Sequence, residues 1–165
     1  MTSDYEAITT LCKRLGEAHA TKDAAAIVSC YAENAVLYGL APPLASRGMS
    51  NADTAAWLAT WDGPIVVDAA DVDLVVDEAI AWTTALNRMR GVKTDGAQVD
   101  LWFRTTMCFR KIGGAWKIVH DHSSTPFYMD GSFRAAVDLT PAAAVAWDAS
   151  AVPAGTWVDE RRTRC

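Results

Sequence analysis

The chain has 165 residues, of which 51% are hydrophobic, and its 20 acidic and 15 basic residues give a formal net charge of −5. This length corresponds to about one domain, which buries roughly two thirds of its unfolded surface. The acidic balance argues against a nucleic-acid-binding surface, which needs a basic stripe. No apolar run approaches the ~20 residues that cross a membrane, and the first ten residues lack the pattern of a signal peptide. We therefore expect a cytoplasmic protein that binds neither nucleic acid nor membrane.

The four cysteines, Cys12, Cys30, Cys108 and Cys165, form neither a Cys-x-x-Cys pair nor a zinc pattern. We interpret the first three as small packing residues that stay reduced in the cytoplasm. No Gly-rich phosphate loop follows a predicted strand, so nucleotide binding has no support. The sequence gives no reason to expect a cofactor.

The N-terminal part of the chain predicts two helices. Ser3 or Asp4 can cap the first, whose apolar residues recur at three- and four-residue steps as far as Leu15. Asp23 caps a short second helix, which we extend to Tyr31.

A strand and a third helix follow. Residues 35–40 predict the strand, and the Ala-Pro-Pro sequence after them cannot continue it. Asn51 or Asp53 can cap the third helix, which carries Trp57 and Trp61 on one face, four residues apart.

Beyond this helix the pattern becomes extended. Residues 64–76 have an extended pattern, and turn signals separate three long strand-like runs, at residues 78–90, 99–111 and 115–124. Helices followed by a meander of long strands predict an α+β fold, with the N-terminal helices packed on a strongly curved antiparallel sheet. Such a sheet makes a cone with a pocket inside. We assign residues 1–141 to this domain and residues 142–165 to an Ala-rich tail, part of which can be disordered.

The Gly113-Gly114 turn sets a register for the last two predicted strands, because a two-residue hairpin pairs Ile112 with Ala115. The alternation of side chains then gives one shared face, apolar near the turn and polar at its far end. We expect this face to point toward the helices, unless a bulge interrupts either strand. Its residues are Phe103, Thr105, Met107, Phe109, Trp116, Ile118, His120, His122 and Ser124.

Two consequences follow from this register. His120 and His122 point into the concave side, where the core gives way to polar groups. Asp121 points outward and lies diagonal to Arg104, which predicts a surface ion pair.

The preceding strand has two plausible registers, because the connection after it is longer. If Val92 lies opposite Val99, Arg88 shares the inner face. A register shifted by one residue places Asn87 and Met89 there instead.

The last two strands resemble a known family. The sequence KIGGAWKIVHDHSSTPF over residues 111–127 resembles the ending of SnoaL-like, ketosteroid-isomerase-related proteins of the nuclear transport factor 2-like superfamily. It is also similar to the Trp-x-Ile-Val-His-x-His-x-Ser segment in the association domain of calcium/calmodulin-dependent protein kinases. The resemblance covers roughly residues 4–141. It implies a cystatin-like cone of three helices on a curved sheet, a pocket between them, and a homodimer.

The resemblance does not specify an activity, because the family includes isomerases, cyclases, dehydratases and proteins without catalysis. Ketosteroid isomerases use an Asp base together with a Tyr and a protonated Asp. No Asp falls on the derived inner face of the last two strands, so we do not expect steroid isomerisation in that form.

His120 and His122 are the strongest catalytic candidates, because an imidazole titrates near pH 6.5 and can move a proton at neutral pH. The alternative is that they make hydrogen bonds within the core. Tyr38 can supply a phenol to the pocket, or hold its hydroxyl at the surface. We expect no metal site, because two histidines need a third ligand and none is spaced to supply it.

Arg88 on the inner face would bind an anionic group such as a carboxylate; otherwise it is an exposed residue near a strand end. Trp57 and Trp61 belong to the core or form the aromatic wall of a pocket. The remaining candidates for ligand contact are Phe103, Met107 and Trp116.

Two functions remain open. The first is a small-molecule binding protein or a cofactor-independent acid–base enzyme of the isomerase, cyclase or dehydratase type, acting on a hydrophobic carbonyl compound. His120 or His122 would move the proton, and Tyr38 or Arg88 would polarise the oxygen. The enzyme needs a pocket of at least ~300 Å³ that exposes both imidazoles. The second function is a non-catalytic association module whose sheet drives dimer formation.

Overall fold

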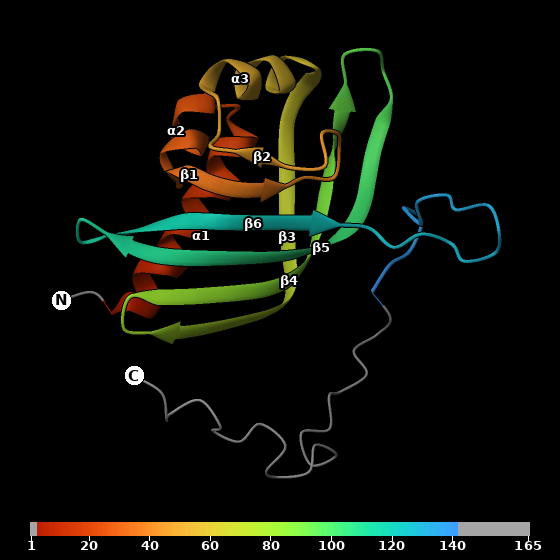
Figure 1. Ribbon diagram of the computed structural model, residues 1–165. Coiled ribbons are helices and arrows are strands. Elements are labelled where there is room, and N and C mark those ends of the chain that lie inside the picture. Colours follow the sequence, from red (N-terminus) through yellow and green to blue (C-terminus); the bar gives the residue numbers. More distant parts are fainter. Residues whose placement is uncertain (1–2, 142–165) are drawn as a thin grey trace, which may run out of the picture.

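The computed structural model describes residues 3–141, so the predicted tail at 142–165 lies outside the described residues. These residues form three helices and six strands (Figure 1). The helices are α1 (Asp4–Ala20), α2 (Ala24–Ser29) and α3 (Asn51–Ala59). The strands are β1 (Tyr31–Tyr38), β2 (Ser46–Arg47), β3 (Trp61–Asp77), β4 (Ile80–Lys93), β5 (Gln98–Ile112) and β6 (Ala115–Ser124).

Each helix begins at a side-chain cap that satisfies backbone N–H groups left free in the first turn. Ser3 and Glu6 form a reciprocal capping box at α1. The Asp23 carboxylate accepts from the Ala26 N–H at 2.9 Å, which confirms the cap of α2. The cap of α3 is Ser50, which precedes both predicted positions, Asn51 and Asp53.

The sheet has the strand order β2-β1-β6-β5-β4-β3. It is antiparallel except that β1 runs parallel to β6, so the expected antiparallel sheet is in fact mixed. The two strands are distant in the sequence, and the long connection between them, which contains α3 and four strands, allows the parallel pairing. The α+β, cystatin-like class is confirmed.

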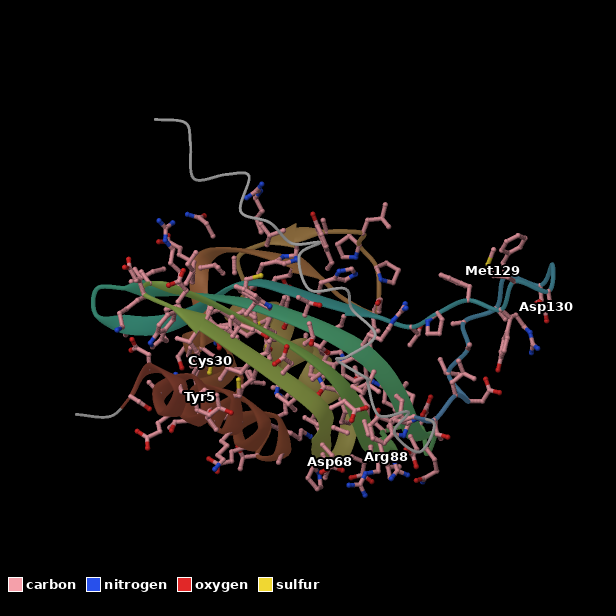
Figure 2. All side chains as sticks on the ribbon, turned by 90° about the horizontal axis from the view of Figure 1, so that it is seen from below. Tyr5, Cys30, Asp68, Arg88, Met129 and Asp130 are labelled. Carbon is pink, nitrogen blue, oxygen red and sulfur yellow. The ribbon has the colours of Figure 1, made fainter. Side chains whose placement is uncertain are left out.

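The core lies between the helices and the inner face of the sheet. Ile8 and Ile27 from the helices are buried against Phe109 and Ile118 from β5 and β6. Burial of each such side chain contributes roughly 1.5–3 kcal/mol. Figure 2 shows α1 along one side of the curved sheet, while the segment that carries Met129 and Asp130 projects away from the body.

The predicted register of the last two strands holds only near the turn. Ile112 pairs with Ala115 and Phe109 with Ile118, as expected. A register shift follows, so that Cys108 pairs with His120.

Val119 is the extra residue of this β-bulge, and it reverses the facing of every later residue of β6. Asp121 and Ser123 therefore point inward, opposite Met107 and Thr105. His120 and His122 lie on the outer face, so their predicted inward orientation is wrong.

Strand β4 adopts the shifted register, because Gly91 pairs with Val99. This places Asn87 and Met89 on the inner face and Arg88 on the outer face. There Arg88 forms a bidentate ion pair with Asp100, in which both N–O distances are 2.7 Å. The expectation that Arg88 enters the pocket is therefore wrong.

Trp61 begins β3 and does not belong to α3. Its buried ring packs over Gly91, where an added Cβ would lie 3.0 Å from the indole. The ammonium group of Lys93 lies 4.2 Å from the centre of the same ring. The indole thus fastens the start of β3 to β4.

Candidate functional site

A cavity of about 220 Å³ lies between the helices and the inner face of the sheet. Its wall is mainly apolar, with a smaller number of polar groups. Because such a wall excludes water, the few polar groups inside determine its chemistry. The apolar contacts come from Cys12, Leu15, Gly16, Trp57, Val67, Ala69, Met89, Phe103 and Met107, and the polar ones from His19, Tyr31, Asn87, Thr105, Asp121 and Ser123.

Asp121 is the charged group of this cavity. Its Oδ2 accepts a hydrogen bond from the Tyr31 hydroxyl at 2.8 Å. Its Oδ1 is buried and has no hydrogen-bond partner among the described residues. Burial raises the pKa of Asp121, while the Tyr31 hydrogen bond and the nearby imidazoles oppose this effect. The free oxygen is therefore suited to give or take a proton.

Tyr31 holds this carboxylate in place from the start of β1. Burial, and then the negative charge of Asp121, raises the pKa of the Tyr31 phenol well above its ordinary value. The phenol therefore keeps its proton at neutral pH and donates it to Oδ2.

His19 enters the cavity from the last turn of α1. Its Nδ1 lies 2.8 Å from the Leu15 carbonyl oxygen, and because a carbonyl only accepts, Nδ1 carries the hydrogen. Burial lowers the pKa of His19, against the effects of the Leu15 bond and the Asp121 charge. The ring is thus neutral near pH 7, with an acceptor lone pair on Nε2.

Asn87, Thr105 and Cys12 also line the cavity. The Asn87 amide donates to the Thr105 hydroxyl oxygen at 2.7 Å, which leaves its second N–H and its carbonyl oxygen for other partners. Burial raises the pKa of Cys12 to about 11, so this thiol stays protonated and is a poor nucleophile.

The cavity includes three of the predicted ligand-contact residues. Trp57, Phe103 and Met107 line it. Trp61 and Trp116 do not. Trp116 is buried at the opposite end of α1, where its indole N–H donates to Asp4 at 2.9 Å.

The predicted catalytic trio lies on the outer face of the sheet. The Tyr38 ring stands edge-on to His120 and His122, with centroids 5.1 Å and 5.6 Å away. The His120 Nδ1 lies 2.9 Å from the Val36 carbonyl and ties β6 to β1. The structure thus separates these three residues from the cavity. The expected ion pair of Asp121 with Arg104 is also wrong, because the bulge turns Asp121 inward.

Sequence reasoning missed Asp121, Tyr31 and His19 as a group. The position of His19 had a signal, because it extends the apolar stripe of α1 from Leu15 by four residues. Asp121 had none, since the bulge that turns it inward depends on the pairing of β6 with its two neighbours.

Within residues 3–141, no three His, Cys, Asp or Glu side chains come together in a way that could hold a metal ion. In the same range, no helix is long and apolar enough to cross a membrane.

Comparison with known proteins identifies the fold and family. The model of the SnoaL-like domain matches residues 8–128. No curated protein matches the chain. A nuclear transport factor 2-like protein of unknown function from Pseudomonas putida is 28% identical, with a TM-score of 0.72 over 81% of this chain and 94% of that one.

Two more distant structures have the same fold. A proposed dehydratase from Streptomyces avermitilis is 17% identical, with a TM-score of 0.63 over 73% of this chain and 95% of that one. A proposed ketosteroid isomerase from Shewanella frigidimarina is 20% identical, with a TM-score of 0.59 over 72% of this chain and 94% of that one.

Proposed function

Because the chain belongs to the SnoaL-like domain family, we propose that it is a cofactor-independent enzyme that moves a proton on a small hydrophobic carbonyl compound. The observation that carries this proposal is the buried, unpartnered Oδ1 of Asp121 in an apolar cavity. Asp121 and His19 are two titratable groups whose pKa values are shifted in opposite directions within one cavity. Such pairs are typical of acid–base sites.

In the proposed reaction, ionised Asp121 takes a proton from the carbon next to the carbonyl. The C–H electron pair becomes the C=C bond of an enolate, and Tyr31 keeps the other carboxylate oxygen in place. The Ser123 hydroxyl and the second amide hydrogen of Asn87 are donors in the cavity for the enolate oxygen. Protonated Asp121 then returns the proton to the same carbon or to a conjugated one, which exchanges or isomerises the substrate.

His19 is the second proton acceptor of the proposed site. Its neutral Nε2 can take the proton of a substrate hydroxyl, as ring closure or loss of water would require. His120 and His122 have no part in this scheme, because they lie on the other face of the sheet.

The size of the cavity limits the substrate. At about 220 Å³ it is smaller than the ~300 Å³ expected from the sequence. It suits a part of a molecule no larger than one or two rings. A non-catalytic association module is the weaker alternative, because association gives no reason for an unpartnered carboxylate oxygen in a cavity.

The proposed location is the cytoplasm. Cys12, Cys30 and Cys108 are free thiols, and thiols stay reduced in that compartment.

The test is deuterium exchange of the α-hydrogens of cyclohexanone and phenylacetone in D₂O, followed by NMR. The protein accelerates exchange, and Asp121→Asn lowers the rate by about 10²-fold or more. His122→Gln is the control and keeps the rate, because His122 is exposed on the outer face. Equal rates for wild type and Asp121→Asn would contradict the role of Asp121. Rates no faster than buffer for both ketones would contradict the activity.

A further inference from the structure

We infer that the substrate is an uncharged molecule of two parts that spans two hollows on either side of Asp121, an inference that rests on the proposed function. The first hollow is the cavity described above. The second, which we call the outer hollow, has a volume of about 270 Å³ and is bounded by the Ala41-Pro42-Pro43 turn and Met49. Asp121 and Ser123 line both hollows.

The shared position of Asp121 follows from strand pairing. Leu37 of β1 pairs with Asp121 of β6, and the chain then leaves β1 to form the wall of the outer hollow. Gly48 holds the end of this wall against β1, because its N–H donates to the Ala35 carbonyl at 2.8 Å. A Cβ at Gly48 would lie 2.5 Å from the Glu33 carbonyl oxygen, and the residue has a φ of +68°. The wall therefore has a fixed place beside Asp121.

Asp121 therefore lies between the two hollows. A substrate whose reacting carbon lies beside Oδ1 has room in both directions. The cavity accepts a ring or a short branched group, and the outer hollow accepts a chain or second ring of similar size. The reacting carbon then lies near the middle of the molecule.

The charges of the two linings exclude an anionic substrate. Within residues 3–141, neither lining includes Lys or Arg, and the single carboxylate present is that of Asp121. Arg88, the pocket cation expected from the sequence, is paired with Asp100 on the outer face. A substrate carboxylate or phosphate would lose its hydration beside Asp121 without gaining a counter-ion. The favoured class is a neutral aldehyde or ketone with an apolar group on each side.

The inference is tested by titration calorimetry with 2-alkylphenols, from phenol to 2-hexylphenol, because an alkyl group next to the O–H starts beside Asp121. A phenol can donate its O–H to the free Oδ1 of Asp121. If the alkyl group enters the outer hollow, Kd falls about three- to fourfold for each added methylene group, up to the length of that hollow. A Kd that does not change with the length of the alkyl group overturns the inference, as does the absence of binding at millimolar 2-hexylphenol.

Two variants block one hollow each. Ala41→Trp places an indole in the outer hollow from an exposed turn, and it removes the gain from chain length while phenol still binds. Gly16→Leu fills the cavity from α1, where an added Cβ meets nothing within 4 Å. This variant raises the Kd of every probe at least tenfold. Lys13→Leu is its control, because it places the same side chain on the exposed face of α1, and it keeps the wild-type Kd values. Retention of the chain-length gain in Ala41→Trp overturns the inference.

The charge argument has its own probe. 3-(2-hydroxyphenyl)propanoate has nearly the shape of 2-propylphenol but carries a carboxylate, and it binds at least tenfold more weakly. Equal affinity of the two overturns the uncharged class. Failure of the proposed function looks different: the chain-length gain persists, but Asp121→Asn leaves both probe affinity and ketone exchange unchanged.

Discussion

At the scale of single residues, the chemistry of this protein depends on how few polar groups enter the cavity. Asp121 has one oxygen bound by Tyr31 and the other free. A buried acceptor without a partner costs free energy of the order of 1–3 kcal/mol. The fold tolerates that cost at a position where a ligand can supply the missing donor, which is why Asp121 is the centre of the proposed site.

The free energy of unfolding depends on whether Asp121 is protonated or ionised. An unfolded Asp has a pKa near 3.9, and burial raises the folded value. The neutral carboxylic acid therefore makes its full contribution to the free energy of unfolding below pH ~4. This contribution is lost as the pH rises through the pKa of Asp121 in the folded protein. Asp121→Asn cannot ionise, so we expect the variant to gain stability relative to wild type as pH rises from 4 to 8.

Urea denaturation at steps of half a pH unit measures this difference, and each unit of raised pKa corresponds to about 1.4 kcal/mol. The comparison of the two proteins cancels the titratable groups that do not interact with Asp121; His19 does interact with it, because the Asp121 charge raises the pKa of His19. A difference that is constant across the range would show that burial does not raise the pKa of Asp121.

Two tyrosines provide a matched pair. Tyr31→Phe removes the hydrogen bond to Asp121 and leaves both carboxylate oxygens without a donor, so we expect a loss of about 1–3 kcal/mol and slower ketone exchange. Tyr38→Phe removes a hydroxyl from the half-exposed outer face and changes stability by less than about 0.5 kcal/mol. Equal effects of the two changes on urea denaturation would contradict this assignment.

At the scale of elements, one extra residue in β6 decides which side chains reach the cavity. Without the bulge at Val119, His120 and His122 would face the helices, as the hairpin register predicts. With it, Asp121 takes the inner position opposite Met107. The bulge leaves the elements and their order unchanged and exchanges the two faces of the strand beyond it.

The contact of β3 with β4 depends on one glycine. Gly91→Ala places a methyl group 3.0 Å from the buried Trp61 ring and 3.2 Å from the Pro64 carbonyl. We expect a loss of about 1–3 kcal/mol in the free energy of unfolding. Gly16→Ala is the control, because it lies in open space on a helix and gains up to about 1 kcal/mol. If thermal denaturation finds Gly91→Ala as stable as wild type, the packing of Trp61 is not as described.

At the scale of the whole molecule, the sheet separates an inner face with the cavity from an outer face with exposed apolar side chains. Trp82 is 43% exposed and Ile80 is 55% exposed on β4. The ion pairs of Arg88 with Asp100 and of Arg90 with Asp68 neutralise charge on the same face. A face with these properties suits the homodimer expected from the sequence, which we retain as a proposal.

If the proposed dimer forms through this face, a charged side chain at position 82 prevents it from forming. Trp82→Glu places an unpaired charge in the interface, so we expect sedimentation to give the mass of two chains for wild type and of one chain for the variant. Leu44→Glu is the control, because Leu44 is 98% exposed on the turn beside the outer hollow. A wild-type protein with the mass of one chain at micromolar concentration would contradict the dimer.

The sequence by itself determined the class of fold, the helices, the turn between the last two strands and the facing of β5. These features depend on local periodicity, on capping side chains and on glycines at a tight turn, all of which are encoded within a few residues. The inward positions of Phe103, Met107 and Ile118 follow from the same alternation.

Only the tertiary structure decided the site. Whether Asp121 or the histidines beside it enter the cavity depends on a bulge between β6 and its neighbours. Whether Arg88 or Asn87 does so depends on a register that the longer β4–β5 connection leaves open. Both choices are made by the pairing of distant strands and by burial against α1, so no local pattern in the chain specifies them.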